Sequence, residues 1–273
     1  MKPYVIAAVL LAAPLPAMAE KLDDLKEQGY ARIAIGNEPP FTAVGSDGKV
    51  SGAAPDVARE VFKRLGIEDV EASILEYGAM IPSLQAGRVD AVTAGLFMKP
   101  ERCNAVAYSE PILCDAEAFL LPGGNPKGFE NYADIAADET ARIGAPGGGT
   151  EEKLALEAGV PRDRVIVVPD AQSGLKMLQD GRIDVYSLPV LSLNDLLSKS
   201  GDEGLEVFAP VKDAPVYCDG AAFNKDDTAL RDAFDVELAK MKESGEFAAI
   251  IEPYGFSADA AKSTTRDKLC AAQ

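Results

Sequence analysis

The sequence predicts an α/β protein with two lobes, each a mostly parallel β-sheet flanked by helices. Over residues 30–94, apolar runs with strand spacing alternate with helical stripes in the order β-α-β-α-β, which is typical of a parallel sheet covered on both faces. The pattern stops at Pro122–Pro126 and then begins again. Two short motifs also recur in the same order after this break, which indicates two units of like construction.

The first strand is expected over Tyr30–Gly36, where apolar residues alternate and then follow one another. The next segment, Asn-Glu-Pro-Pro-Phe at 37–41, can continue neither a strand nor a helix. A helix should begin at Pro55 and end at Gly66, because Pro is favoured at helix starts and Gly at helix ends. Residues 70–75 then alternate as a second strand. The apolar stripe of the helix consists of Val57, Val61, Phe62 and Leu65.

Two motifs of the first half recur in the second half. Leu-Gln-Ala-Gly-Arg-Val-Asp at 84–90 returns at 178–184 as Leu-Gln-Asp-Gly-Arg-Ile-Asp. Ala-Arg-Ile at 31–33 returns at 141–143. In both copies of the longer motif, a helix is expected to end at the Gly and a buried strand to begin after the Asp, as at 91–94.

The later elements follow the same reasoning. Strands are expected over 116–121 and Tyr217–Asn224, and a last helix should end near Tyr254. The tail, residues 257–273, is polar and would be disordered unless Cys270 ties it down. Between the last strand and the last helix lies a helical stripe of Leu230, Phe234, Leu238 and Met241.

This order divides the chain between two lobes. Residues 20–118 and 217–273 would form the first lobe, and residues 119–216 the second. The chain would then cross between lobes twice, through Phe119–Leu121 and again near Pro215. Two crossings make a hinge.

Residues 1–19 are expected to be a cleavable signal peptide that directs export to the periplasm. Lys2 supplies a positive charge, Val5–Leu11 form an apolar run too short to span a membrane, and Ala17–Ala19 is a small-x-small cleavage site. The formal net charge of −17 becomes −18 without these residues, because Lys2 is the only charged one. Such acidity argues against binding to nucleic acids or anionic membranes.

The sequence has four Cys and no His. Exported proteins with an even number of Cys usually form disulfides, and three pairings are possible. We favour Cys103–Cys114, which is local, and Cys218–Cys270, which would fix the tail; buried free thiols are the alternative. Without His, Ser-His-Asp and Cys-His catalytic sites and His-based metal sites are excluded, and no cofactor or metal is expected.

The stretch Asp90–Arg102 is the strongest candidate for a ligand-binding segment. A strand breaks at Gly95 and is followed by an aromatic ring, Phe97, and a guanidinium, Arg102. In the first turn of a helix a cation gains nothing from the helix dipole, whereas a planar fork of donors is suited to a carboxylate. Ligands of open α/β sheets bind beyond the carboxyl ends of strands, where Glu38, Phe97 and Thr150 are expected.

Five further features stand out: Asn37–Phe41, Leu84–Asp90, Pro100–Arg102, Tyr108–Pro111 and the C-terminal helix. Together they resemble a known family, the polar amino-acid class (family 3) of solute-binding proteins of ABC importers. The resemblance covers about residues 30–256 and implies the type II periplasmic binding protein fold, with two lobes and two hinge crossings. It also implies a monomer that captures a small molecule and delivers it to importer permease subunits.

Within this family, the sequence is similar to the receptors for ectoine and 5-hydroxyectoine, which are small zwitterions. That likeness implies an aromatic cage around the ring amidinium, an acid for its N–H groups, and Arg102 for the carboxylate. Backbone N–H groups of 147–149 and the Thr150 hydroxyl would also bind the carboxylate. The implied site residues are Glu38, Phe41, Tyr77, Phe97, Arg102, Thr150 and Glu151.

One position departs from the amino-acid receptors. These usually carry an Asp in the strand that follows the second-lobe Arg-x-Asp, where it pairs with the α-ammonium of the ligand. Here that position falls at about Pro189. A ligand with a free α-ammonium would lose its usual partner, whereas ectoine has no such ammonium.

Each of these residues also has a purely structural interpretation. Phe41, Tyr77 and Phe97 could be ordinary core residues, and Glu38 could form a surface ion pair with Arg102. Likewise, Thr150 could cap its helix and Glu151 could favour the helix dipole.

The function expected from this resemblance is a periplasmic receptor for ectoine or 5-hydroxyectoine, not an enzyme. An alternative within the same class is a receptor for a polar amino acid or for another compatible solute such as a betaine. A second alternative is a dehydratase acting on a cyclic acid, in which Glu38 would be the general acid or base. A third is an extracellular sensor module, which normally has an attached membrane span that is not predicted here.

Overall fold

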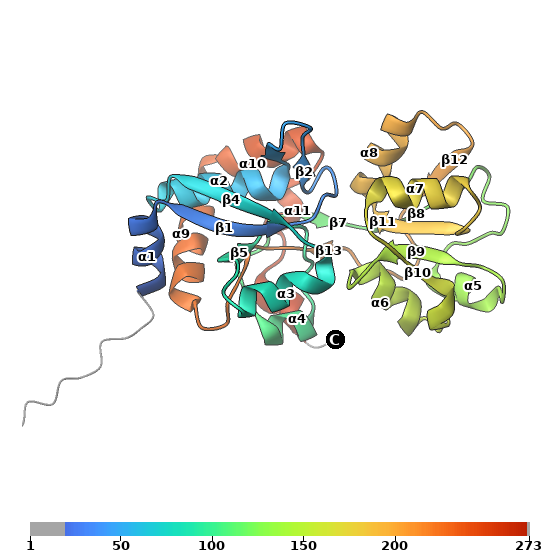
Figure 1. Ribbon diagram of the computed structural model, residues 1–273, viewed down its shortest axis with the longest axis horizontal. Helices are drawn as coiled ribbons and strands as arrows, with labels where there is room; N and C mark the ends of the chain where they lie inside the picture. The colour runs from blue at the N-terminus through green and yellow to red at the C-terminus, as the bar shows by residue number, and fades with distance from the viewer. Residues whose placement is uncertain (1–19, 272–273) are drawn as a thin grey trace, which may run out of the picture.

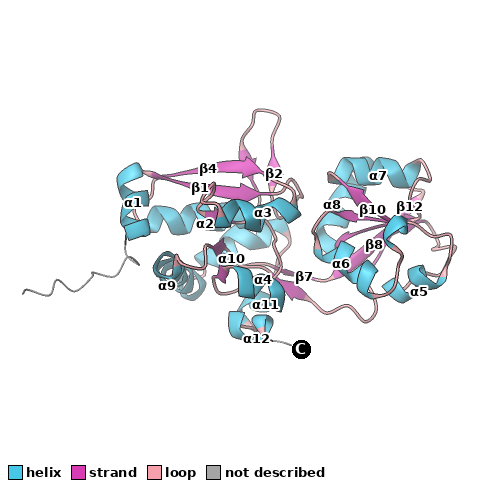
Figure 2. Ribbon diagram, turned by 60° about the horizontal axis from the view of Figure 1, so that its bottom comes forward, coloured by secondary structure: helices cyan, strands magenta, loops and turns pink. Residues whose placement is uncertain are grey.

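The computed structural model describes residues 20–271 and has two lobes, with strands β7 and β13 passing between them (Figure 1). The predicted signal peptide, residues 1–19, lies outside the described residues. Each lobe contains a five-stranded sheet with helices packed around it (Figure 2). Within residues 20–271, no helix is both long and apolar enough to cross a membrane.

The sheet of the first lobe is mostly parallel, as predicted. The strand β1 pairs in parallel with its neighbours on both sides, and β14 pairs antiparallel with β5 and β6. Four strands therefore point one way and β14 points the other. In spatial order the strands are β4 (Asp69–Ile74), β1 (Tyr30–Ile35), β5 (Ala91–Val92), β14 (Ala222–Phe223) and β6 (Ala107–Tyr108).

The sheet of the second lobe has the same arrangement, position for position. Three parallel strands are followed by one antiparallel strand and a fifth that again points the first way. The two recurring sequence motifs thus mark two lobes of like construction. In spatial order the strands are β10 (Val165–Val168), β9 (Ile143–Pro146), β11 (Val185–Pro189), β8 (Glu117–Pro122) and β12 (Leu205–Phe208).

Helices surround both sheets, and a two-stranded hairpin, β2 (Ala43–Val44) with β3 (Val50–Ser51), lies beside the first. The first lobe contains α1 (Glu20–Gln28), α2 (Ala53–Arg64), α3 (Tyr77–Gln85), α4 (Pro100–Ala105), α9 (Thr228–Ser244), α10 (Glu246–Ile251), the 3₁₀ turn η2 (Glu252–Tyr254), α11 (Ala258–Lys262) and α12 (Arg266–Cys270). The second lobe contains α5 (Tyr132–Ala137), α6 (Thr150–Glu157), the 3₁₀ turn η1 (Arg162–Arg164), α7 (Ala171–Gln179) and α8 (Val190–Ser200).

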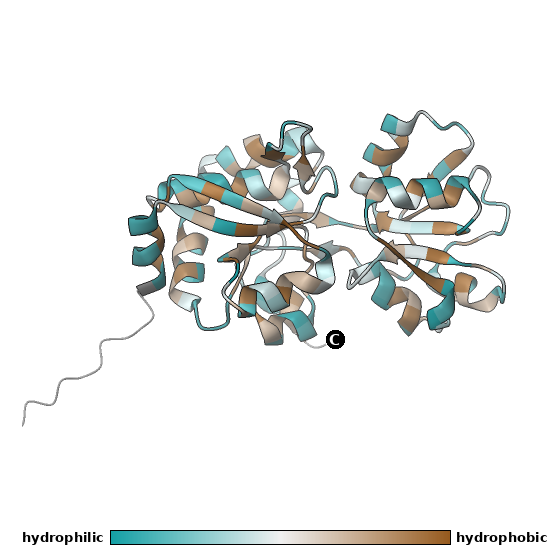
Figure 3. Ribbon diagram, in the orientation of Figure 1, coloured by the Kyte–Doolittle hydropathy of each residue, from teal (hydrophilic) through white to brown (hydrophobic). Residues whose placement is uncertain are grey.

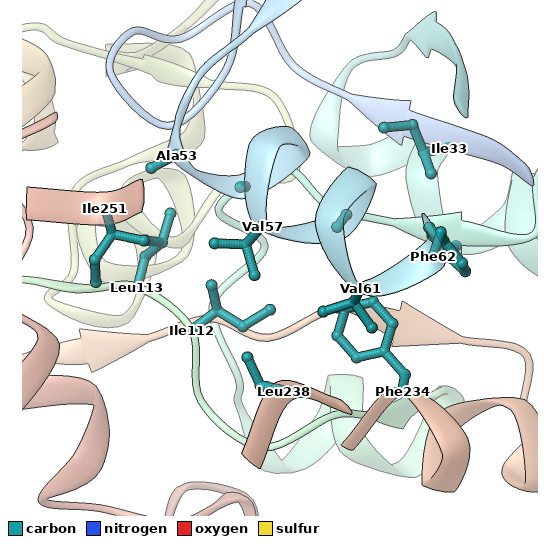
Figure 4. Packing of buried hydrophobic residues seen from close by; sticks show 14 of the residues in the cluster. Ile33, Ala53, Val57, Val61, Phe62, Ile112, Leu113, Phe234, Leu238 and Ile251 are labelled. Carbon is teal, nitrogen blue, oxygen red and sulfur yellow. The ribbon is translucent and has the colours of Figure 1, made fainter. Parts of the chain in front are cut away.

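The core of the first lobe forms around the apolar stripe of α2. Val57, Val61 and Phe62 are fully buried there, against Phe234 and Leu238 of α9 (Figure 4). Apolar and polar residues alternate in bands along both strands and helices (Figure 3). Burial of this apolar surface is what holds the sheet and its helices together.

The longer recurring motif ends in an aspartate that accepts the same backbone hydrogen bond in both lobes. Asp90 accepts hydrogen bonds from the backbone N–H of Arg32 at 2.8 Å and from its guanidinium at 2.8 and 3.0 Å. Asp184 accepts from the backbone N–H of Arg142 at 2.9 Å. Each aspartate therefore ties the strand after the motif to the first strand of its own lobe.

The chain passes between the lobes at β7 (Cys114–Asp115) and β13 (Tyr217–Cys218), which pair with each other (Figure 1). The first crossing thus lies earlier than expected, because Phe119–Leu121 belong to β8 and pair within the second sheet. The second passes close to Pro215, as expected. The exact limits of the two lobes in sequence stay a prediction.

The predicted disulfide pairing is wrong, although all four Cys are paired. Cys114 joins Cys218, because β7 and β13 place these two residues opposite each other with Cα atoms 4.0 Å apart. Cys103 joins Cys270, because α12 packs against α4. Closeness in sequence misled the prediction, since Cys103 lies on a helix and Cys114 on a strand between the lobes.

Two other expectations change for related reasons. The segment Tyr217–Asn224 is two short strands rather than one, because β13 pairs with β7 and β14 joins the first sheet. The tail is ordered as α11 and α12 through residue 270, where the disulfide to Cys103 holds it.

Candidate functional site

A small cavity lies between the lobes, beyond the carboxyl ends of β1, β5, β9 and β11. The structure brings all seven predicted side chains together around it, along with Gly95, Gly149 and Pro189. A second cavity adjoins it and shares Glu38 and Tyr77. The seven side chains are Glu38, Phe41, Tyr77, Phe97, Arg102, Thr150 and Glu151.

Glu38 is the acid of the cavity, and it is only 7% exposed. Its carboxylate accepts a hydrogen bond from the Ser192 hydroxyl of the other lobe at 2.7 Å and from the Tyr77 hydroxyl at 3.2 Å. Tyr77 also lies 2.9 Å from the carbonyl oxygen of Ala94. Burial, and then the nearby carboxylate of Glu151, raise the pKa of Glu38 to about 8. A cation bound here would favour the ionised carboxylate.

Phe41 and Phe97 are both core residues and cavity residues. Both are buried in the core of the first lobe, and their rings meet edge to face at 5.9 Å. Phe97 also stacks on Tyr217 of β13 at 5.6 Å. Gly95 makes room for this arrangement, since a Cβ there would lie 2.8 Å from the Phe41 ring. The core interpretation is therefore correct, and it is compatible with a wall of aromatic rings.

Arg102 lies in the first turn of α4, which has Pro100 at its N-terminus, as predicted. Its guanidinium donates to the carbonyl oxygens of Phe97 and, across the lobes, of Gly148, both at 2.9 Å. Among residues 20–271, no ion pair involves either Arg102 or Glu38. The interpretation of these two as a surface ion pair is therefore wrong.

Thr150 begins α6, but it does not cap it. The N-cap position is Gly149, and the Thr150 hydroxyl is buried without a hydrogen-bond partner in the described part of the chain. The expectation for the preceding loop needs correction as well. The N–H groups of Gly148 and Gly149 already donate, to the Glu152 carboxylate at 2.6 Å and the Pro146 carbonyl at 3.0 Å. Within the described residues, the Thr150 hydroxyl remains available to a ligand.

Glu151 is 5% exposed and its pKa is raised by burial. Its neighbour Glu117, on β8, was not predicted, and the two carboxylate oxygens of Glu117 are buried without a partner among residues 20–271. Burial, and then the Glu151 carboxylate, raise the pKa of Glu117 well above its usual range, while the ammonium of Lys99 opposes the shift. Lys99 itself lies 4.8 Å above the Tyr217 ring. Glu151 and Glu117 therefore favour the protonated form when no cation lies near them.

Ser192 was not predicted either. It sits in the first turn of α8, three residues after Pro189, and no motif in the sequence distinguishes it. Its importance comes from the closure of the two lobes, which brings its hydroxyl to Glu38. Pro189 itself lines the cavity at the end of β11, as the departure noted in the sequence had indicated.

Comparisons with known proteins show the family of the chain. Residues 31–258 match the model of the bacterial extracellular solute-binding proteins, family 3. A probable amino-acid ABC transporter periplasmic-binding protein, y4tE of Sinorhizobium fredii, is 34% identical over 96% of this chain and 90% of its own. The L-cystine-binding protein TcyJ of Escherichia coli K12 is 28% identical, with 88% of each chain covered.

Among solved structures, the chain is similar to EhuB in complex with hydroxyectoine. The two are 81% identical, with a TM-score of 0.92, over 93% of this chain and 99% of EhuB. The lobed architecture, the interlobe cavity and the family match over most of the chain lead to one conclusion. This protein belongs to family 3 of the bacterial extracellular solute-binding proteins.

Proposed function

We propose that this protein is a periplasmic receptor that captures ectoine or 5-hydroxyectoine between its lobes and delivers it to an ABC importer. The observation that carries the proposal is the composition of the cavity wall. Three aromatic side chains and the buried acid Glu38 share the cavity with Arg102 and an unpartnered Thr150 hydroxyl. The 81% identity to EhuB, which was solved with hydroxyectoine, supports the same ligand class.

The aromatic rings and Glu38 suit the cationic end of ectoine. Its charge is delocalised over a ring amidinium, which is weakly hydrated and favours aromatic faces, at roughly 0.5–2 kcal/mol for each contact. Phe41, Tyr77 and Phe97 supply those faces. Glu38 supplies an acceptor for the ring N–H groups, and its burial makes the charge-assisted hydrogen bond stronger.

Arg102 and Thr150 suit the carboxylate end. Within the described residues, two of the five N–H groups of Arg102 donate to backbone carbonyls and hold the guanidinium in place, which leaves the others for a ligand. The Thr150 hydroxyl can donate to the same carboxylate from the second lobe. A ligand held from both lobes favours the closed state, because it gains both sets of contacts only there.

A receptor for a polar amino acid or a betaine-like solute is the second candidate. The names of the curated relatives, which refer to amino acids and L-cystine, favour an amino acid. Against it, Pro189 lines the cavity where the related receptors usually provide an Asp for the α-ammonium. Glu38 and Glu151 are the remaining acids that could serve such a group.

We infer that the protein is a receptor and not a dehydratase. The Glu38 carboxylate is held by hydrogen bonds from Ser192 and Tyr77, an arrangement that suits a fixed acceptor for a cation. The sequence offers no His as a second proton-transfer group. Conversion of a cyclic acid by the purified protein would overturn this inference.

The proposal also includes three further points. The protein is exported by a cleavable signal peptide, it is a monomer, and it docks to permease subunits.

The test is titration calorimetry on mature protein that has been unfolded and refolded, because such receptors can retain a ligand through purification. Ectoine, 5-hydroxyectoine, arginine, cystine and glycine betaine are titrated in parallel. We expect saturable heat with ectoine and 5-hydroxyectoine, and binding of an amino acid alone would contradict the proposal.

Arg102→Ala should lose about 2–5 kcal/mol of binding free energy, as expected when one partner of a buried charged pair is removed. Arg59→Ala, on the outside of α2, is the matched control and should bind normally.

A further inference from the structure

We propose that Gly148 is a positioning residue of this site: its missing side chain lets the lobes close at α3, and its carbonyl then orients the Arg102 guanidinium. This inference rests on the proposed function, since it concerns how the same cavity attains its affinity. Gly148 belongs to the loop between β9 and α6 in the second lobe, whereas α3 and Arg102 belong to the first.

The first observation is a close approach of two backbones. A Cβ on Gly148 would lie 2.5 Å from the Cα and 2.6 Å from the N of Gly78, in the first turn of α3. Backbone atoms cannot move aside as the end of a flexible side chain can, so any larger residue at 148 must push the lobes apart. Gly148 also has a φ of +74°, a conformation that favours glycine.

The second observation is a pair of hydrogen bonds made across the same contact. The Gly78 N–H donates to the Gly147 carbonyl at 3.1 Å, and the Arg102 guanidinium donates to the Gly148 carbonyl at 2.9 Å. The loop is also held within its own lobe, because the Glu152 carboxylate accepts a hydrogen bond from the Gly148 N–H at 2.6 Å. An ion pair between Lys153 of α6 and Glu101 of α4 closes the rim nearby.

These contacts connect closure to ligand affinity. In the open state Arg102 keeps its hydrogen bond to the Phe97 carbonyl, within its own lobe, but loses the one to Gly148. Closure therefore fixes the guanidinium at a second point, and the carboxylate of the ligand meets a preorganised fork of donors. Obstructing the contact should weaken binding even though every ligand-contacting side chain is intact.

The experiment compares four variants with the wild type. Gly148→Ala places a Cβ against Gly78. Gly124→Ala is its control, because Gly124 has a φ of +78° in the same lobe and a Cβ there would have no atom within 4 Å. The second pair is at Gly78, which has an ordinary φ and is exposed: an Ala Cβ would lie 3.6 Å from the Gly147 carbonyl, in normal contact, whereas Leu extends into the loop. Gly78→Leu therefore obstructs closure from the first lobe without strain at 148.

The readouts are the ectoine dissociation constant, its dissociation rate, and molecular size by small-angle X-ray scattering at saturating ectoine. We expect Gly148→Ala and Gly78→Leu to raise the dissociation constant about tenfold or more, through faster dissociation, and to remain expanded when saturated. Gly124→Ala and Gly78→Ala should bind and compact like the wild type.

Normal affinity and compaction in Gly78→Leu would overturn the inference, and this variant decides the matter if Gly148→Ala does not fold. Absence of ectoine binding by the wild-type protein would instead refute the proposed function. The comparison would then be made with the compound from the ligand panel that does bind, since the contact between Gly148 and Gly78 does not depend on ligand identity.

Discussion

Glu38 is the cavity acid whose pKa we expect ligand binding to change. In the closed cavity without a cation, its carboxylate is buried beside Glu151, and its pKa is raised to about 8. A cation at hydrogen-bonding distance stabilises the ionised form and lowers that pKa. Ligand binding and proton release at Glu38 are therefore coupled.

The sign of this coupling gives a prediction for the pH dependence of binding. In the closed ligand-free state the pKa of Glu38 is raised to about 8, whereas a bound cation lowers it, so ectoine binding to protein that is already closed should release protons near neutral pH. Affinity should therefore rise from about pH 6 to about pH 8 and then level off. Calorimetry in two buffers with different ionisation enthalpies measures the number of protons released.

The control for this prediction is Glu157→Gln, which removes an exposed acid at the end of α6, outside the cavity. It should release the same number of protons as the wild type. An observed heat that is independent of the buffer, with affinity constant over this pH range, would show that Glu38 is already ionised before the ligand arrives.

For single residues, the sequence identifies a binding role where the side chain is unusual for its position. Arg102 in the first turn of a helix and Phe97 just after a strand break both stand out, and both line the cavity. Glu117 and Ser192 do not stand out, because an acid at a strand start and a serine in a helix are common. Ser192 matters because it contacts Glu38 of the other lobe, and Glu117 because it is buried beside Glu151; both features depend on tertiary structure.

Among the elements, α4 matters most because it carries Arg102. This helix is only six residues long and buries no residue completely, so the apolar contacts of Cys103 and Ala105 hold it only in part. It is held at its C-terminal side by Lys225, whose ammonium donates to the carbonyls of Cys103 and Asn104 at 2.9 and 3.2 Å. The Cys103–Cys270 disulfide joins it to α12.

Removing that disulfide should therefore affect stability more than ligand affinity. The bridge links residues 167 positions apart, and a cross-link of that span restricts the unfolded chain strongly, with typical stabilisation of about 2–4 kcal/mol. The double variant Cys103→Ser with Cys270→Ser should lose stability of this order in urea-induced unfolding. Its affinity for ectoine should stay within a few-fold of the wild type, because Lys225 still holds α4.

A large loss of affinity with little loss of stability would contradict this account. It would mean that the disulfide positions Arg102 directly. The unfolding midpoints should be compared at the same ligand-free state, since bound ectoine would itself stabilise the folded protein.

Elements with strong local patterns were predictable, and their long-range partners were not. The stripe of α2 and the paired motifs ending in Asp90 and Asp184 follow from periodicity and from Gly at helix ends, which are local effects. The disulfide partners and the division of Tyr217–Asn224 depend on which strand pairs with which. Sequence spacing alone does not contain that information.

For the whole molecule, the repetition of one topology explains where the site lies. Both sheets have their antiparallel strand in the fourth position, and both direct the carboxyl ends of their parallel strands toward the cavity. Glu38 follows β1 and Thr150 follows β9, the equivalent strands of the two lobes. The two lobes therefore place the loops that follow their parallel strands on either side of one ligand.

The measurement that tests this account most directly is a crystal structure of the refolded protein with ectoine. We predict that the carboxylate lies within hydrogen-bond distance of Arg102 and the Thr150 hydroxyl, with the ring amidinium at Glu38. The aromatic rings of Phe41 and Phe97 should contact the ligand. A ligand found instead in the adjoining cavity, with its carboxylate away from Arg102, would contradict the central claim.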